Sequence, residues 1–274
     1  MSGPVERVVV VLDATAENRT AIDVAVRLAV RARAPLHAVF VEHEDLLSLA
    51  GLEVAREVVA GAGAGPLIAE QVELHLRAAA IRAEQDILAA AQIGALEYSF
   101  ETVRGGAATA FSVASERDLV VAGALARPVA GHFQVESRWL SALELAPGPI
   151  LLARKGGKGA GGIVVLLRER TTAAGRLLEA AARIMAPEDG AITVICPSAL
   201  SAREGFAEWV DEQIEPSTTR PRIEPAPGEA AELHARIAQL GCGILAIGAG
   251  ATEGDPKQIR EQSERLDCDV LIVP

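Results

Sequence analysis

The chain has 274 residues, of which 50% are hydrophobic and 23% charged; this excludes global disorder and suits two folded domains. Aromatic residues make up only 3% and the net charge at pH 7 is −11, which argues against nucleic acids and anionic membranes as partners. No apolar leader follows a basic start, every apolar run is too short for a membrane span, and the three cysteines form no CxxC pair. We therefore expect a cytoplasmic protein with reduced thiols.

Short apolar strands alternate with helices along the first part of the chain. Residues 8–12 read VVVVL, which suits a strand buried on both faces. The next segment predicts a helix, because its apolar residues share one side: Ala21, Ile22, Ala25, Leu28 and Ala29. A strand over 36–41 and a long helix over about 66–94 follow. Further strands are predicted near residues 100–101, 119–123 and 149–152.

The second part of the chain repeats this order of elements. Residues 164–167, a helix around Leu177 to Met185, and residues 192–197 match the first three elements at an offset of 156. A shorter helix over about 201–214 comes next, and strands are predicted near residues 223–224, 244–248 and 269–272. Alternation of this kind predicts an α/β protein: two tandem, doubly wound, five-stranded parallel sheets of the Rossmann-like type.

A glycine-rich segment separates the two repeats. Residues 155–162 read KGGKGAGG, a composition typical of a flexible linker. We therefore expect one domain over residues 1–154, a linker over 155–162 and a second, shorter domain over 163–274. A glycine-rich hairpin inside a single domain is the alternative.

Ligands of such sheets bind at the carboxyl ends of the strands, near the point where the strand order reverses. In the first repeat the residues at these ends are Asp13, Val41 and the loop that begins at Gly123. In the second repeat they are Glu169 and Pro197, at the offset of 156, and the loop from Gly248, where the offset has changed. These positions are where a binding site is expected.

The ordered set of elements resembles the universal stress protein family in its tandem form. The residues that carry the resemblance are a strand ending at Asp13, the segment DLVVAG over 118–123, and APGP over 146–149. The resemblance covers nearly the whole chain and implies an adenine nucleotide alpha hydrolase-like fold. It also implies a binding or regulatory role in the stress response.

Members of that family that bind ATP hold its phosphates with three glycines followed by Ser or Thr, because glycines let backbone N–H groups approach phosphate oxygens. Counted back from residues 146–147, the pattern falls on Gly123, Ala126, Glu136 and Ser137. Ala126 adds a methyl group, and the Glu136 carboxylate would repel a phosphate. The resemblance therefore implies a degenerate phosphate loop.

The nucleoside half of the family's site matches this chain better. Asp13 falls on the position that binds the ribose hydroxyls, and Val41 on the position whose backbone meets the adenine. The resemblance thus implies Asp13, Val41, Gly123 and Ser137 as binding residues. In the second repeat Glu169 replaces the aspartate, and Pro256 and Lys257 stand where the last Gly-Ser would be. We expect that repeat not to bind.

No residue pattern predicts a catalytic or metal site. We expect a non-catalytic module without a bound cofactor, although ATP or another adenine nucleotide remains open. The alternatives are a true ATP binder that hydrolyses slowly and a ligand-free module that binds an unknown protein. The two repeats are expected to pair as a pseudo-dimer, and a homodimer through the fifth strands, residues 150–153 and 270–273, is a further alternative.

Three other features allow two readings each. His43, between Glu42 and Glu44, predicts a solvated acidic loop more readily than a metal ligand. The glycine-rich residues before the long helix predict either a mobile lid or a plain connector. Cys242 and Cys268 begin neighbouring strands, so they could lie close, and a redox role for them or for Cys196 stays open.

Overall fold

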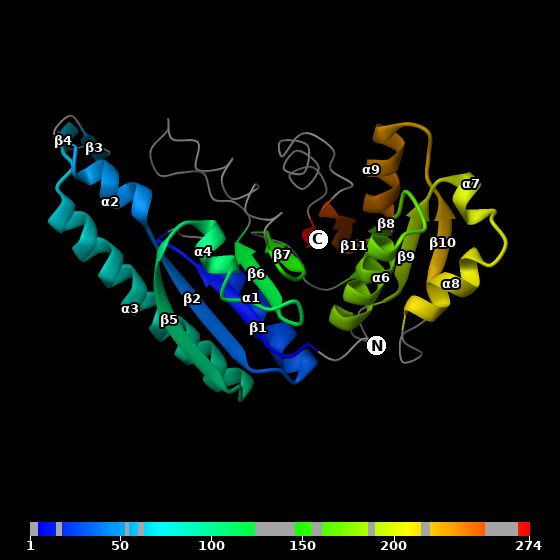
Figure 1. The fold of residues 1–274 in the computed structure, drawn as a ribbon, viewed down its shortest axis with the longest axis horizontal. Coiled ribbons are helices and arrows are strands. Elements are labelled where there is room, and N and C mark those ends of the chain that lie inside the picture. Colours follow the sequence, from blue (N-terminus) through cyan, green and yellow to red (C-terminus); the bar gives the residue numbers. More distant parts are fainter. Residues whose placement is uncertain are drawn as a thin grey trace.

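One ten-stranded sheet runs through the whole molecule (Figure 1). The structure is a computed structural model and describes residues 5–14, 18–52, 55–59, 63–123, 146–154, 161–185, 190–214, 220–249 and 268–274. Across the sheet the strands follow the order β10-β9-β8-β11-β12-β7-β6-β1-β2-β5. Their bounds are β1 (Val8–Leu12), β2 (Leu36–His43), β5 (Tyr98–Gly105), β6 (Leu119–Gly123), β7 (Ile150–Ala153), β8 (Gly162–Leu166), β9 (Ile192–Cys196), β10 (Arg222–Pro225), β11 (Cys242–Gly248) and β12 (Asp269–Val273).

The sheet consists of two parallel halves that meet in the middle. Strands β7, β6, β1, β2 and β5 are parallel to one another, and so are β10, β9, β8, β11 and β12. Among the described residues, helices lie between successive strands from β1 to β6, with β3 and β4 as an added hairpin, and from β8 to β11. The prediction of two five-stranded, doubly wound sheets is therefore confirmed. In Figure 1 the first half lies on the left and the second on the right, with β7 near the middle.

The two halves are joined by their fifth strands. β7 and β12 pair in the antiparallel sense, with Leu151 opposite Leu271. This pairing is the pseudo-dimer expected from the sequence, formed within one chain. Because β7 also pairs with β6, and β12 with β11, neither fifth strand keeps a free edge. The alternative of a homodimer through these strands is therefore wrong for this structure.

Helices cover both faces of the sheet. On one face lie α1 (Asn18–Ala32), α3 (Ala69–Gly94), α6 (Thr172–Ile184), α7 (Ser198–Ser201) and α8 (Phe206–Gln213), whose apolar residues form one cluster with the strands. On the other face lie α4 (Ala107–Phe111) and α9 (Ala230–Gln239). The short helix α2 (Glu44–Ala50) packs against the start of α3. Among the described residues, no helix is both long and apolar enough to cross a bilayer.

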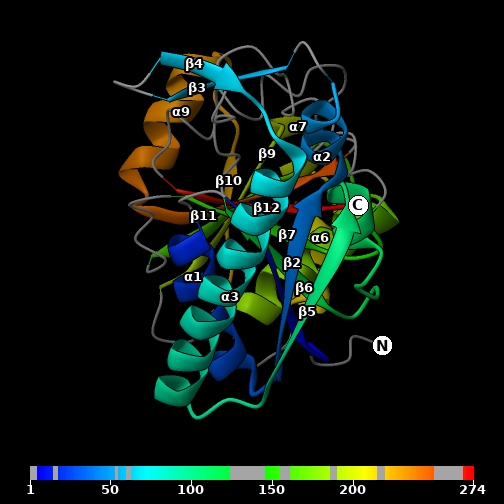
Figure 2. The same cartoon turned by 90° about the vertical axis from the view of Figure 1, so that its left-hand side faces the viewer.

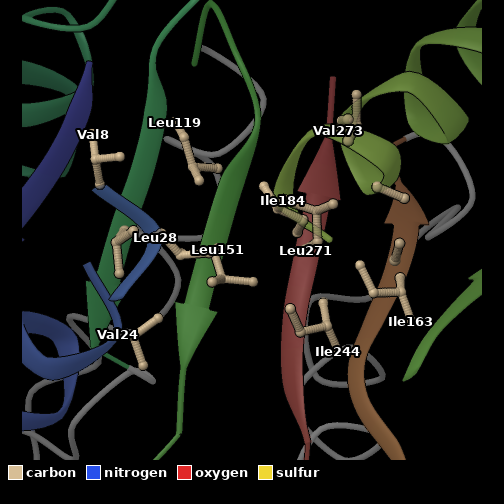
Figure 3. Packing of buried hydrophobic residues seen from close by; sticks show 14 of the residues in the cluster. Val8, Val24, Leu28, Leu119, Leu151, Ile163, Ile184, Ile244, Leu271 and Val273 are labelled. Carbon is tan, nitrogen blue, oxygen red and sulfur yellow. The ribbon is translucent and has the colours of Figure 1, made fainter. Parts of the chain in front are cut away.

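A continuous core crosses the junction between the halves. In Figure 3, Leu151 on β7 and Leu271 on β12 lie on neighbouring strands, with Leu28 of α1 near Leu151 and Ile184 of α6 near Leu271. All four side chains are buried in the same cluster. The Arg31 guanidinium adds a polar contact, since its Nη1 donates to the carbonyl of Ile184 at 2.9 Å. The halves therefore share one hydrophobic core on this face.

Several sequence expectations differ from the structure at element boundaries. The long helix begins at Ala69, and the glycine-rich segment before it contains a hairpin, β3 (Arg56–Val59) and β4 (Gly63–Pro66). Figure 2 shows this hairpin beside the first turns of α3. The helix expected over 201–214 is divided into α7 and α8. Gly162, expected in the linker, is the first residue of β8, and residues 155–160 lie outside the described residues.

Candidate functional site

The strand order reverses between β1 and β6. From β1 the chain continues to β2 on one side, and it returns to β6 on the other. Val11 pairs with Ala122, so Asp13 and Gly123 follow at the same carboxyl edge of the sheet. Such a switch point is where open α/β sheets bind ligands. The structure thus brings together two of the residues singled out in the sequence.

Asp13 is held in place by the start of α1. Its backbone N–H donates to Asn18 Oδ1 at 3.1 Å, and Asn18 Nδ2 donates back to the Asp13 carbonyl at 2.5 Å. These two bonds tie the end of β1 to the start of α1. The Asp13 side chain is only 18% exposed, so the carboxylate lies at the sheet edge and is not free in solvent.

His43 joins Asp13 at this edge. Its Nε2 lies 3.6 Å from Asp13 Oδ2, and its side chain is 21% exposed. A separation of 3.6 Å is an ionic contact when the imidazole is protonated, but it is too long for a direct hydrogen bond. The sequence prediction of a solvated acidic loop here is wrong, because β2 continues to His43 and α2 begins at Glu44.

Val41 differs from its expected role. It lies inside β2 and pairs with Val103 of β5, and its side chain is fully buried in the core. The strand ends two residues later than expected because Glu42 and His43 continue the pairing, supported by an ion pair between Glu42 and Arg104 at 3.2 Å. The first backbone groups beyond β2 are therefore those of α2.

Most of the phosphate half of the expected site lies outside the described residues. Ser137, Ala126 and Glu136 all lie outside the described residues. Gly123, the first position of the glycine pattern, is described as the last residue of β6 and is partly exposed.

The hydrogen-bond register aligns the two halves residue by residue. Val8 of β1 and Ile163 of β8 are equivalent, since each pairs with the matching residues of its two neighbouring strands: Val8 with Leu36 and Leu119, Ile163 with Ile192 and Ile244. The structural offset between the first strands is thus 155 residues, one fewer than the sequence repeat suggested. The apolar runs VVVVL and IVVLL are too uniform to define this register alone.

With this register, the residue equivalent to Asp13 is Arg168. Glu169, expected at that position, lies one residue further on, and both side chains are exposed. The second half therefore presents a cation where the first presents a carboxylate. Pro197 is exposed at the N-terminal end of α7, and Gly248 ends β11 as Gly123 ends β6. Among the described residues at these equivalent positions, the carboxylate is therefore found in the first half and the guanidinium in the second.

The second half has a separate polar pocket between α6 and α8. It has a volume of about 430 Å³, and the Arg170 guanidinium lies over the Trp209 ring at 5.2 Å from its centroid. Arg176 and Glu179 bring opposite charges to the same lining. None of the strand-end residues named above lines this pocket, which therefore does not correspond to the expected site.

Within the described ranges, no group of three or more His, Cys, Asp or Glu residues is arranged to hold a metal ion. Asp13 and His43 are only two side chains of these types in contact with each other. The chemistry of this contact is that of a hydrogen-bond acceptor beside an imidazole, which suits hydroxyl groups of a ligand.

Comparisons with known proteins support the fold. No family model and no curated protein matches the sequence. Among solved structures, a universal stress protein from Archaeoglobus fulgidus is similar over 97% of this chain and 95% of its own, with a TM-score of 0.60 and 12% identity. A putative universal stress protein from Pseudomonas aeruginosa covers 98% and 93%, with a TM-score of 0.55 and 15% identity.

A protein of unknown function from the same species is similar at a TM-score of 0.50 and 14% identity, over 97% of this chain and 92% of its own. These likenesses extend over nearly the full length of both partners, so they include both halves of this chain. At such low identities they establish the fold, which is that of universal stress proteins.

Proposed function

We propose that this chain, which has the universal stress protein fold, is a non-catalytic binding module of the stress response. Its first half would hold an adenine nucleotide at the switch point between β1 and β6. The second half would complete the sheet and the shared core without binding a nucleotide.

The observation that carries this proposal is the contact between the Asp13 carboxylate and the His43 imidazole at the carboxyl edge of the sheet. A carboxylate accepts hydrogen bonds from hydroxyl groups, and the family resemblance implies that Asp13 binds the ribose hydroxyls. Asn18 fixes the backbone of Asp13 on both sides, and the Asp13 side chain is partly shielded from water, so the position of the carboxylate is restricted before a ligand arrives. His43 Nε2, 3.6 Å away, limits the space beside the carboxylate and favours a polar ligand.

Two observations support a single, weakened site. Arg168 occupies the position of Asp13 in the second half, and a guanidinium has no acceptor for ribose hydroxyls. In the first half, Ala126 and Glu136 replace two glycines of the phosphate pattern. The carboxylate of Glu136 would raise the free energy of a bound triphosphate but would not affect a nucleoside.

Calorimetric titration with adenosine, AMP and ATP tests the proposal. We expect one binding site per chain, with ATP bound no more tightly than about 100 μM, which corresponds to roughly −5.5 kcal/mol. Asp13→Asn should weaken adenosine binding at least about 10-fold. The substitution replaces one of the two carboxylate oxygens that can accept from ribose hydroxyls with an NH₂ group, which only donates. Arg168→Ala, at the equivalent position of the second half, is the matched control and should leave the affinity unchanged.

Other outcomes distinguish the alternatives. Binding of ATP well below 100 μM, with release of phosphate, would establish a true ATP-binding protein that hydrolyses slowly. Failure of all three ligands to bind the wild-type protein would leave a module that acts only through protein contacts. Equal losses in the Asp13→Asn and Arg168→Ala variants would place the site elsewhere.

A further inference from the structure

The start of β11 contains an irregularity that reorients Cys242. Against β8, Cys242 pairs with Gly162 and Ile244 pairs with Ile163. Between these two pairs the chain moves two residues along β11 but only one residue along β8. In a regular strand Cys242 and Ile244 would face the same side. Here Ile244 belongs to the cluster on the α1 face, whereas Cys242 packs against the cluster on the α9 face. A bulge of this kind redirects a side chain.

The redirected thiol faces Cys268. Cys268 immediately precedes β12, the neighbour of β11, and its fully buried side chain belongs to the α9-face cluster. The two side chains therefore lie on one face, at the same ends of adjacent parallel strands, and each thiol shifts the pKa of the other. Cys242 is partly exposed and Cys268 is buried, so the pair lies at the margin of the core and a peroxide would reach it from the Cys242 side.

The interaction makes the two thiols unequal. It raises the pKa of Cys242 and lowers the pKa of Cys268, so Cys268 is the thiol that more readily becomes a thiolate. The positive charge of Arg154 also favours the Cys268 thiolate, while burial and Asp269 oppose it. Cys196 differs from both: it is buried in β9, and burial raises the pKa of its thiol.

We propose that Cys242 and Cys268 are a redox site that forms a reversible disulfide with a peroxide. The Cys268 thiolate attacks the peroxide O–O bond and becomes a sulfenic acid, and the released hydroxide takes a proton to form water. The Cys242 sulfur then attacks the sulfenic sulfur, losing its proton, and a second water leaves as the S–S bond forms. Two thiols are oxidised and one hydrogen peroxide is reduced to two waters.

The oxidised form would link β11 directly to β12, the strand that joins the two halves. This site is separate from the Asp13 edge and does not depend on nucleotide binding. Reduction by a thiol, through exchange at the same sulfurs, would restore the starting state. The Cys242–Cys268 disulfide would therefore form in response to oxidants, next to the strand pair that joins the two halves.

Peptide mapping of the wild-type protein tests the proposal without any substitution. The protein is treated with hydrogen peroxide, alkylated, digested and analysed by mass spectrometry. We expect a pair of peptides linked through Cys242 and Cys268, a loss of about 2 Da from the chain, and reversal by dithiothreitol. Cys196 should remain alkylatable after unfolding, which makes it the internal control.

Two variants examine the order of events. Cys242→Ser should leave a sulfenic acid on Cys268 that dimedone traps, and Cys268→Ser should leave Cys242 unreactive. The proposal would be overturned by wild-type protein whose thiols all stay alkylatable at peroxide levels that oxidise a dithiol peptide. It would equally be overturned by a link that involves Cys196, or by conversion of Cys268 to sulfinic acid without a disulfide.

Discussion

Two buried aspartates of the molecule have opposite electrostatic environments. Asp118 and Asp269 are each 1% exposed. Burial alone would raise the pKa of Asp118, but hydrogen bonds from the Arg7 guanidinium at 2.8 and 3.0 Å and from the Ser115 N–H at 2.8 Å hold it below its ordinary value. Burial raises the pKa of Asp269, whose Oδ1 accepts from the Arg154 N–H at 2.8 Å. Its Oδ2 has no hydrogen-bond partner in the part of the chain that the structure describes.

The same substitution at these two residues should therefore have different effects. At pH 7, Asp118→Asn should lower the free energy of unfolding by about 1–3 kcal/mol, because it leaves Arg7 without its charged acceptor. Asp269→Asn should leave stability unchanged or increase it, because it keeps an acceptor for Arg154 and removes a buried charge. Urea unfolding monitored by circular dichroism measures both.

The pH dependence gives the sign of each contribution. Asp118 has a lowered folded-state pKa, so its stabilisation is present above the ordinary value of 3.8 and is lost as the pH falls below it. Asp269 has a raised folded-state pKa, so its penalty is absent below 3.8 and develops as the pH rises through the folded-state value. Equal losses of stability for both variants at pH 7 would contradict this account.

Individual site residues were also predicted less completely from the sequence than the helices and strands that carry them. Asp13 and Gly123 could be placed at the site because the carboxyl ends of parallel strands share one edge. His43 was missed as a neighbour of Asp13, since nothing local showed that β2 continues through Glu42 to His43. Arg168 was missed because uniform apolar strands define their register only through pairing with neighbours.

At the scale of elements, two glycines allow close packing at the start of β8. A Cβ on Gly162 would lie 2.7 Å from the Ala191 carbonyl oxygen. A Cβ on Gly161, whose φ is +139°, would lie 2.7 Å from the Gly241 carbonyl oxygen. Both contacts are with backbone, which cannot move aside as a side chain can. These residues belong to the packed sheet, although the sequence suggested a flexible linker.

Gly162→Ala should consequently destabilise the protein by about 1–3 kcal/mol, as overpacking does in other interiors. Thermal unfolding measures the change. Gly228→Ala is the matched control, because a Cβ at Gly228 meets nothing within 4 Å, and it should leave the midpoint within error. A Gly162→Ala variant as stable as the control would show that β8 begins later than described.

Helices and strands with clear periodicity were predicted well, and irregular ones were not. The helix α1 stands out in the sequence because its buried apolar residues recur at helical spacing. The strand β1 stands out because all five of its residues are apolar, and all five are buried. The β3–β4 hairpin has no such signal, since its second strand reads GAGP and pairs only with its neighbour. The break between α7 and α8 follows from Gly205, which has a φ of +72° at the start of α8.

At the scale of the whole molecule, the two halves form one sheet and share one core. The internal repeat predicted this pairing, because fifth strands with uncovered edges need a partner. The extent of the shared core was not predictable, since it depends on how α1 and α6 meet across β7 and β12. We therefore expect the chain to unfold as one cooperative unit.

Leu151→Ala tests this unity. The side chain is fully buried at the junction, and its loss should cost about 2–5 kcal/mol. Differential scanning calorimetry should show one transition in both wild-type and variant protein, with calorimetric and van't Hoff enthalpies in agreement. Two separate transitions, with only one of them shifted by the substitution, would mean that the halves unfold independently.

The proposed function depends on an intact nucleoside half and an altered phosphate half of one site. The most direct test is to compare adenosine and ATP affinities in wild-type protein and in an Ala126→Gly/Glu136→Gly double variant by calorimetric titration. We expect the double variant to bind ATP at least about 10-fold more tightly, roughly 1.4 kcal/mol, with adenosine affinity unchanged. No gain for ATP, or an equal gain for both ligands, would contradict the assignment of this site.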